Sequence, residues 1–339
     1  MYKKITKISP YISTANIGDY IISDYCNRIL SELFGDYLGI DVPSREIVST
    51  TGNDAILTSD YTFVCGTNLL ASDMRKYKQW NIDRLTPLRI ALANYAKREV
   101  YRFDIIKERL SQIHMILFGV GWVSYQDKPT RYTKDILRRN LDEKYIHSVR
   151  DSYTEEKLNE IGIHNVLNTA CPTMWGLTGD LCSQIPTSKS NTVVTTITYY
   201  RKSYERDKVF LDILLSTYSN VYLWLQSYED YSYLEKLGYA DKVKTIAPTL
   251  KCYDTFLDNY ETDYIGTRLH GGIRALNHKK RSCLIGIDNR ALEISKDTDL
   301  PVIKAEQIEN SLREWIYNKK PTEIRLPIEN INKWKSQFK

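Results

Sequence analysis

An arginine and a histidine stand two residues apart in the segment Tyr264-Ile-Gly-Thr-Arg268-Leu-His270-Gly-Gly-Ile. An apolar run ending in glycine precedes them, and a helical pattern follows. A guanidinium there can bind a phosphate or carboxylate, and a neighbouring histidine can transfer a proton near neutral pH. Gly271 and Gly272 would let a ligand approach the backbone at the helix N-terminus. The pattern predicts an anion site with a proton donor; a structural ion pair and a core histidine are the alternative.

A second candidate is the turn Ser13-Thr-Ala-Asn16-Ile-Gly18-Asp19, which lies between an apolar run and a helical pattern. Gly18 permits a tight turn, and Asn16 tolerates left-handed backbone geometry. The N–H groups of the following helix can bind an anion or a sugar hydroxyl. A plain turn with Asp19 as the helix N-cap explains the same residues.

A third candidate is Ser148-Val-Arg150-Asp151-Ser152, at the end of another expected strand. Arg150 can supply a second guanidinium from the first half of the chain. Asp151 can orient that guanidinium or cap the next helix. A surface ion pair between the two side chains is the alternative.

Short β-rich runs alternate with amphipathic stretches along the chain, which indicates an α/β fold with largely parallel sheets. Strands are expected at Lys4–Ser9, Ile47–Thr51, Tyr61–Gly66, Ile113–Gly119, His147–Val149, Val166–Thr169, Thr192–Tyr199, Val221–Gln226, Val243–Ile246, Asp263–Gly266 and Cys283–Ile287. Helices are expected at Ile21–Phe34, Thr154–Ile161, Lys208–Ser216, Ser227–Leu237 and Leu269–Asn277.

The length of 339 residues predicts two domains, because a single core rarely grows beyond about 250–300 residues. The polar, proline-containing stretch 183–191 marks the boundary. We expect an N-terminal α/β domain at 1–185, a C-terminal α/β domain at 190–304, and a helical segment at 305–339 that packs back on the first domain. Two Rossmann-like domains facing a cleft would bind ligands at the carboxyl ends of their strands.

Composition excludes several classes of protein. Apolar residues make up 42% and charged residues 26% of the chain, and the net charge is 47 − 42 = +5, which is typical of a folded enzyme and not of a disordered or fibrous protein. The basic clusters are too short to indicate nucleic acid binding. The histidines and cysteines lack metal-ligand spacing, and no dinucleotide or P-loop motif is present, so no metal and no cofactor are expected. The absence of a signal sequence and the scattered cysteines predict a cytoplasmic protein.

Taken together, short motifs in a fixed order resemble the polysaccharide pyruvyl transferase family. They are Asn16-Ile-Gly-Asp19, Val64-Cys-Gly66, Gly119-Val-Gly121, Val149-Arg-Asp-Ser152, Ile265-Gly-Thr-Arg-Leu-His270 and Leu284-Ile-Gly-Ile287. The resemblance implies a glycosyltransferase-B-like architecture and the transfer of pyruvate from phosphoenolpyruvate onto two hydroxyls of a sugar. The products would be a cyclic ketal and phosphate.

The resemblance also implies roles for individual residues. The N-terminal domain would form the acceptor side and the C-terminal domain the phosphoenolpyruvate side. Arg268, Leu269, His270 and, by a looser match, Arg150 would contact phosphoenolpyruvate. We expect His270 to act as general acid and Asp19 to act as base. The remaining expected substrate-binding residues are Gly271, Gly272, Asn16 and Gly18. One departure from the family is Cys171-Pro, where many members have Asp-Pro, which removes a carboxylate from the expected acceptor side.

Two other functions fit the same features. A sugar-nucleotide-dependent glycosyltransferase of the GT-B type shares the expected architecture, and a non-catalytic sugar-binding subunit would tolerate loss of Arg268 and His270. Family members modify galactose, mannose or mannosamine residues, and the sequence does not select among them. A lipid-linked acceptor would bring the protein to the inner face of the membrane as a peripheral protein.

Overall fold

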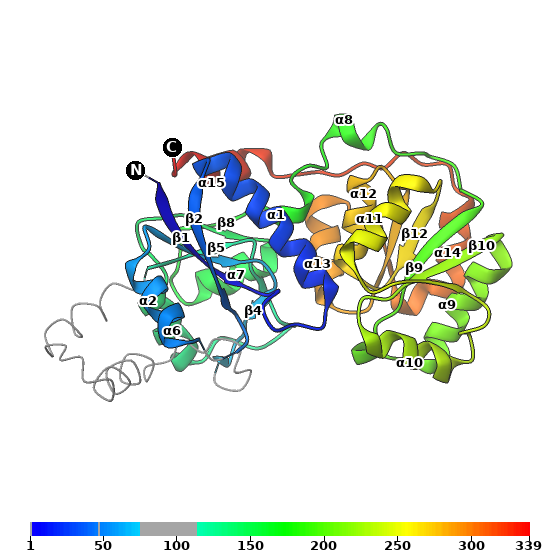
Figure 1. The fold of residues 1–339 in the computed structure, drawn as a ribbon, viewed down its shortest axis with the longest axis horizontal. Coiled ribbons are helices and arrows are strands. Elements are labelled where there is room, and N and C mark those ends of the chain that lie inside the picture. Colours follow the sequence, from blue (N-terminus) through cyan, green and yellow to red (C-terminus); the bar gives the residue numbers. More distant parts are fainter. Residues whose placement is uncertain (1, 47, 75–113) are drawn as a thin grey trace, which may run out of the picture. The chain divides into compact units, whose positions relative to one another are not determined.

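Two compact α/β units make up the described chain, and each has its own parallel sheet (Figure 1). The computed structural model describes residues 2–46, 48–74 and 114–339. The first unit consists of Met1–Ser13, Ile22–Pro172 and Ile328–Lys339, and the second of Thr14–Ile21 and Thr173–Pro327. This division differs from the expected boundary at 183–191. The predicted α/β class with parallel sheets is confirmed, and the cleft between the domains stays a prediction.

The first unit is built on a four-stranded parallel sheet in the order β2-β1-β3-β5. Its strands are β1 (Lys3–Ser9), β2 (Tyr37–Pro43), β3 (Tyr61–Cys65) and β5 (Met115–Phe118). Two short parallel pairs extend it, namely β4 (Asn68–Leu70) with β6 (Gly121–Trp122) and β7 (His147–Val149) with β8 (Val166–Asn168). The Gly119 N–H donates to the Ser148 carbonyl at 3.0 Å, so β7 lies beside β5. The arrangement brings the carboxyl ends of these strands to one edge.

The described helices of the first unit are α1 (Ile17–Phe34, whose first residues belong to the second unit), α2 (Thr50–Thr58), α6 (Arg131–Asn140), α7 (Ser152–Glu160) and α15 (Ile328–Ser336). Three of them, α2, α6 and α7, begin where the side chains of Ser49, Thr130 and Asp151 accept from free backbone N–H groups. The predicted strand Ile47–Thr51 is wrong where it is described, because Ser49 caps α2 by accepting from the Gly52 N–H at 3.1 Å. Residues 47 and 113, both placed in expected strands, lie outside the described residues.

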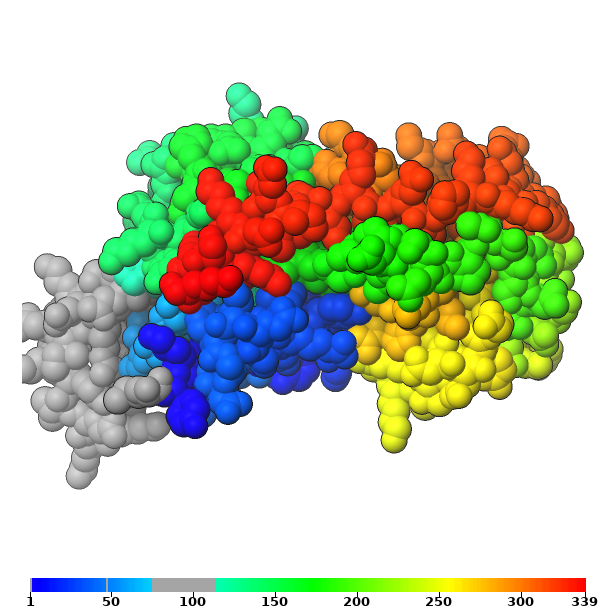
Figure 2. All heavy atoms as spheres, turned by 90° about the horizontal axis from the view of Figure 1, so that it is seen from above, coloured from blue at the N-terminus to red at the C-terminus, as the bar shows by residue number. Residues whose placement is uncertain are grey.

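The C-terminal helix α15 belongs to the first unit. Trp334 stacks on Phe118 with ring centroids 4.6 Å apart, and Phe338 packs edge-on against Phe63 at 5.4 Å. Figure 2 shows these C-terminal residues lying against the N-terminal and central segments of the same unit. The preceding residues, 305–327, belong to the second unit.

The second unit has a six-stranded parallel sheet in the order β11-β10-β9-β12-β13-β14. Its strands are β9 (Thr192–Thr196), β10 (Asn220–Trp224), β11 (Lys244–Ile246), β12 (Asp263–Gly266), β13 (Ser282–Gly286) and β14 (Val302–Lys304). Numbered along this unit, the order is 3-2-1-4-5-6, which is the doubly wound Rossmann order. The strand order reverses between β9 and β12, and ligands of such sheets bind at the carboxyl ends of those two strands.

Helices cover both faces of this sheet (Figure 1). They are α9 (Tyr204–Thr217), α10 (Tyr228–Leu237), α11 (Leu250–Asn259), α12 (Leu269–Asn277), α13 (Asn289–Thr298) and α14 (Ile308–Tyr317). The short helix α8 (Gly179–Cys182) lies in the loop that leads to β9. On one face, Ile265 and Leu223 join a core with Phe210 of α9 and Leu312 of α14. Among the helices described here, none has the length and apolar character needed to cross a bilayer.

Candidate functional site

Arg268 connects β12 to α12 at the point where the strand order of the second sheet reverses. It occupies the N-cap position of α12 with only 4% of its surface exposed. Two hydroxyl groups fix its backbone, because the Arg268 N–H donates to Thr196 Oγ1 at 3.2 Å and the Tyr264 hydroxyl donates to the Arg268 carbonyl at 2.8 Å. The guanidinium is therefore placed by β9, β12 and the helix entrance together.

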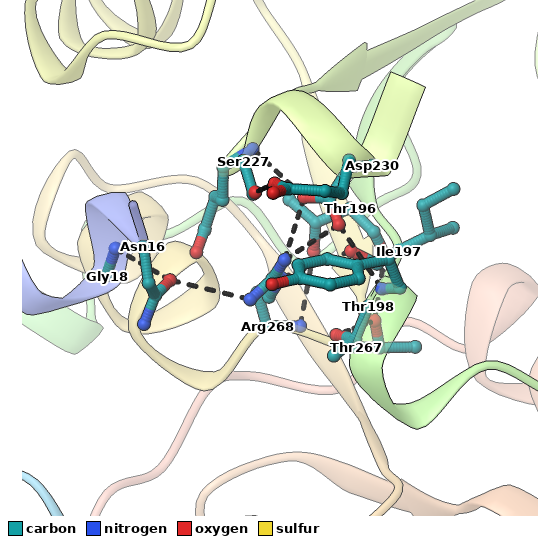
Figure 3. A network of polar contacts seen from close by, with 12 residues as sticks. Asn16, Gly18, Thr196, Ile197, Thr198, Ser227, Asp230, Thr267 and Arg268 are labelled. Carbon is teal, nitrogen blue, oxygen red and sulfur yellow. Dashed lines mark hydrogen bonds and ion pairs between the residues drawn. The ribbon is translucent and has the colours of Figure 1, made fainter. Parts of the chain in front are cut away.

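The guanidinium of Arg268 makes three strong hydrogen bonds within the unit (Figure 3). Its Nη2 donates to both carboxylate oxygens of Asp230 at 2.7 and 2.8 Å, and its Nε donates to the Ile197 carbonyl at 3.1 Å. Burial raises the pKa of Asp230, while the charge of Arg268 opposes that rise. These bonds leave Nη1 as the nitrogen that can bind a ligand.

Nη1 of Arg268 faces the start of α1, where it lies 3.4 Å from Asn16 Oδ1 (Figure 3). The same oxygen accepts from the Gly18 N–H at 3.2 Å, so Asn16 is the N-cap of α1. The alternative interpretation of Asp19 as N-cap is therefore wrong. Asp19 lies in the first turn, 2% exposed, and accepts a hydrogen bond from Thr14 at 2.9 Å. The structure thus brings Asn16, Gly18 and Arg268 together, and their contact with substrate stays a prediction.

Tyr200 adjoins Arg268 and links it to Arg290, and the sequence did not indicate either residue. The Tyr200 ring lies over the Arg268 guanidinium at 4.9 Å. The Tyr200 hydroxyl also interacts with Arg290, which forms an ion pair with Asp288 at the carboxyl end of β13. Asp288 raises the pKa of Arg290 against the effect of burial, so this second guanidinium stays charged. Arg290 is the second residue of α13, a helix that the sequence analysis did not predict, so no local pattern indicated it.

The glycines of α12 serve close packing. A Cβ on Gly272 would lie 2.7 Å from the ring of Tyr264, and one on Gly271 would lie 2.7 Å from Gln226 Nε2. The predicted contact of both glycines with substrate stays a prediction. Leu269 and His270 share this first helical turn with 6% and 7% of their surfaces exposed. His270 is two positions after Arg268 in the sequence and lies in the first turn of the helix that Arg268 begins.

Arg150 lies at the end of β7 in the first unit, with 1% of its surface exposed. Its Nε donates to Asp151 at 3.2 Å, and its Nη2 donates to Asn68. Asp151 also caps α7 by accepting from the Thr154 N–H at 2.8 Å, so both expected roles of Asp151 occur together. A Cβ on Gly121 would lie 2.2 Å from Arg150 Nε, which explains the glycine there. A shared substrate for Arg150 and Arg268, which belong to different units, stays a prediction.

Metal binding finds no support in residues 2–46, 48–74 and 114–339, where no three His, Cys, Asp or Glu side chains are grouped as metal ligands. The described site consists of guanidinium groups, helix N-termini and a histidine. Such a set can bind an anion and move a proton.

The fold is that of a Rossmann-like α/β protein, with a buried arginine at the start of a helix at the switch point of its second sheet. Comparison with known families identifies the group within that class. The polysaccharide pyruvyl transferase family model matches residues 16–289, and the chain belongs to that family. The matched range includes both the Asn16 turn and the Arg268 to His270 segment.

Two solved structures resemble the chain at 10% sequence identity. One is the UDP-GlcNAc 2-epimerase of Methanocaldococcus jannaschii in complex with UDP-GlcNAc and UDP, with a TM-score of 0.46 over 95% of each chain. The other is the E. coli heptosyltransferase WaaC with ADP-2-deoxy-2-fluoro heptose, with a TM-score of 0.40 over 92% of this chain and 98% of that one. Comparison with curated proteins gives no significant match.

Proposed function

We propose that the protein transfers pyruvate from phosphoenolpyruvate onto two hydroxyls of a sugar in a polysaccharide precursor, forming a cyclic ketal and releasing phosphate. The observation that carries the proposal is the fixed guanidinium of Arg268 at the N-terminus of α12, with Nη1 directed toward the N-terminus of α1. Membership of the pyruvyl transferase family supports it. Phosphoenolpyruvate carries a carboxylate and a phosphate on a small frame, which suits a guanidinium beside free helix N–H groups.

Arg268 would bind the substrate through Nη1. Asp230 and the Ile197 carbonyl hold its other nitrogens, so the guanidinium is preorganised before the ligand arrives. The contact from Nη1 to Asn16 is long, at 3.4 Å, so a charged oxygen can replace it at small loss. Arg150 would hold the second anionic group, with its own angle fixed by Asp151 and Asn68.

His270 would donate the proton that the reaction requires. Protonation of the methylene carbon converts it to a methyl group and leaves a cation-like centre at C2, to which the first sugar hydroxyl adds. Loss of phosphate allows the second hydroxyl to attack the same carbon and close the ketal. Asp19 would remove a hydroxyl proton, and one proton in total leaves with the phosphate or to solvent. Positioned proton transfer of this kind usually contributes roughly 10²–10⁴-fold to the rate.

Calorimetric titration with phosphoenolpyruvate tests the donor assignment. The variant Arg268→Lys keeps a positive charge beside Asp230 but cannot bind Asp230 and a ligand through one planar group. We expect wild type to bind phosphoenolpyruvate and Arg268→Lys to bind it at least about tenfold more weakly. Arg313→Ala is the matched control, because Arg313 is an exposed arginine of the same unit. Binding of nucleotide sugars without binding of phosphoenolpyruvate would contradict the proposal.

A further inference from the structure

Gln226 lies two residues beyond β10, beside the helix entrances of the second unit, and 1% of its surface is exposed. Its backbone is held on both sides. The Gln226 N–H donates to Asp230 Oδ2 at 3.2 Å, and its carbonyl accepts from the Ile17 N–H at 3.1 Å. One residue is therefore linked to the ion-pair partner of Arg268 and to the first turn of α1.

The side-chain amide of Gln226 lies against the first turns of two helices. An added Cβ on Gly271 of α12 would come within 2.7 Å of Nε2, and one on Gly18 of α1 would come within 3.4 Å of Oε1. Within the part of the chain that the structure describes, Nε2 has no hydrogen-bond partner. The amide donor is thus buried between two helix N-termini, of 18 and 9 residues.

A buried donor without a partner destabilises a fold, and proteins keep such groups chiefly where a ligand or a water completes them. Trp224, the last residue of β10 and two residues before Gln226, carries a second such donor, because its indole N–H also lacks a partner among the described residues. The first turns of α1 and α12, where helices carry partial positive charge, both lie against this amide, and Arg268 balances the charge of Asp230 beside it. An acceptor oxygen carrying negative charge fits these surroundings best.

We propose that Gln226 Nε2 donates a hydrogen bond to an anionic oxygen, a phosphate or a carboxylate, of the substrate held at the entrance of α12. Gln226 Nε2 and Arg268 Nη1 would then both donate hydrogen bonds to one ligand. Asp230 holds both residues in place, because it accepts from the Gln226 backbone N–H and from Arg268 Nη2. The inference rests on the proposed function, because it assigns a further binding residue to the same site.

Calorimetric titration with phosphoenolpyruvate and, separately, with inorganic phosphate tests this assignment. Gln226→Leu removes the donor at similar size, and Gln226→Glu replaces the donor with a carboxylate oxygen. We expect Gln226→Leu to weaken binding of both probes about 10- to 100-fold, as for a hydrogen bond to a charged group, and Gln226→Glu to weaken it further. Gln184→Leu, an exposed glutamine of the same unit, is the control and should bind like wild type.

The thermal midpoint separates a ligand contact from a structural role. Without ligand, Gln226→Leu should melt at or above the wild-type midpoint, because the variant no longer buries an unpartnered donor. Affinity within about twofold of wild type for both probes would overturn the inference and leave the proposed function standing. If wild type binds phosphate but not phosphoenolpyruvate, the proposed function fails, and the effect of Gln226→Leu on phosphate still decides the inference. If wild type binds neither probe, both fail.

Discussion

Nη2 of Arg268 binds both carboxylate oxygens of Asp230, at 2.7 and 2.8 Å, and neither side chain has more than 4% of its surface exposed. This pair fixes the plane of the guanidinium and therefore the direction of Nη1. Asp230 lies 38 residues before Arg268 and reaches it from the first turn of α10. The ion pair that the sequence offered as an alternative to anion binding thus exists, and it orients the group proposed to bind the anion.

Replacing Asp230 with asparagine should damage both stability and binding. The variant keeps the shape of the side chain but leaves the buried charge of Arg268 uncompensated, a change that usually costs about 3–5 kcal/mol. We expect a lower urea midpoint and weaker phosphoenolpyruvate binding in calorimetry. Asp254→Asn is the control, because Asp254 pairs with Arg274 and its side chain is one-quarter exposed. The loss of stability in this variant should therefore be smaller. Equal losses in the two variants would mean that Asp230 has no special role in orienting Arg268.

Replacing Asn16 with aspartate should separate stability from binding. Aspartate caps a helix as well as asparagine does, so the start of α1 should be preserved. Its charge, however, would lie at the oxygen that is 3.4 Å from Arg268 Nη1 and would compete with an anionic ligand. We expect an unchanged thermal midpoint and phosphoenolpyruvate binding at least about tenfold weaker, measured by melting and calorimetry. Asn16→Ser keeps the cap without the charge and should retain more affinity. Equal binding by the aspartate variant and wild type would place the ligand away from Nη1.

A methyl group at Gly121 should displace Arg150. The added carbon would lie 2.2 Å from Arg150 Nε, and overpacking of this kind usually costs about 1–3 kcal/mol. We expect Gly121→Ala to lower the thermal midpoint and, if Arg150 holds the second anionic group, to raise KM for phosphoenolpyruvate. Gly179→Ala is the matched control, since an added carbon there has no described neighbour within 4 Å. An unchanged KM in a folded Gly121→Ala protein would remove Arg150 from the substrate site.

His147 should make stability depend on pH. Burial lowers its pKa to about 4, and its Nδ1 accepts from the Leu117 N–H at 3.2 Å. Because the unfolded chain binds the proton near pH 6.5, stability should fall as the pH drops from about 6.5 to 4, by up to about 1.4 kcal/mol per pH unit. His147→Asn offers a similar acceptor that does not titrate, so its urea midpoint should vary less over this window. His164→Asn, at an exposed position, should keep the wild-type slope. A wild-type slope in His147→Asn would show that another group causes the acid sensitivity.

Local sequence patterns predicted the elements around the site well. Strand β12 and helix α12 have the expected bounds, because an unbroken apolar run, a glycine and a helical pattern follow one another there. Strand β2 was missed, because it is an edge strand whose side chains are mostly partly exposed and so lack a buried apolar run. Helix α1 starts before the predicted Ile21, since the Asn16 side chain rather than Asp19 caps it.

Partners distant in sequence could not be predicted. Nothing near Arg268 indicates Asp230 or Tyr200, which lie in the segments that follow β10 and β9 and meet Arg268 only through the order of the sheet. Gln226 carries no motif, and its importance follows from burial and from the missing side chains at Gly18 and Gly271. When residues distant in the sequence meet only in the folded protein, a single sequence carries no local pattern that indicates their contact.

The most direct test of pyruvyl transfer is a reaction in D2O with phosphoenolpyruvate and oligosaccharides of galactose, mannose or mannosamine, followed by NMR and a phosphate assay. The account predicts a ketal whose methyl group carries one deuterium, with one phosphate released per ketal, and a rate roughly 10²–10⁴-fold lower in His270→Ala. Consumption of a nucleotide sugar, with no ketal and no phosphate from phosphoenolpyruvate, would contradict it.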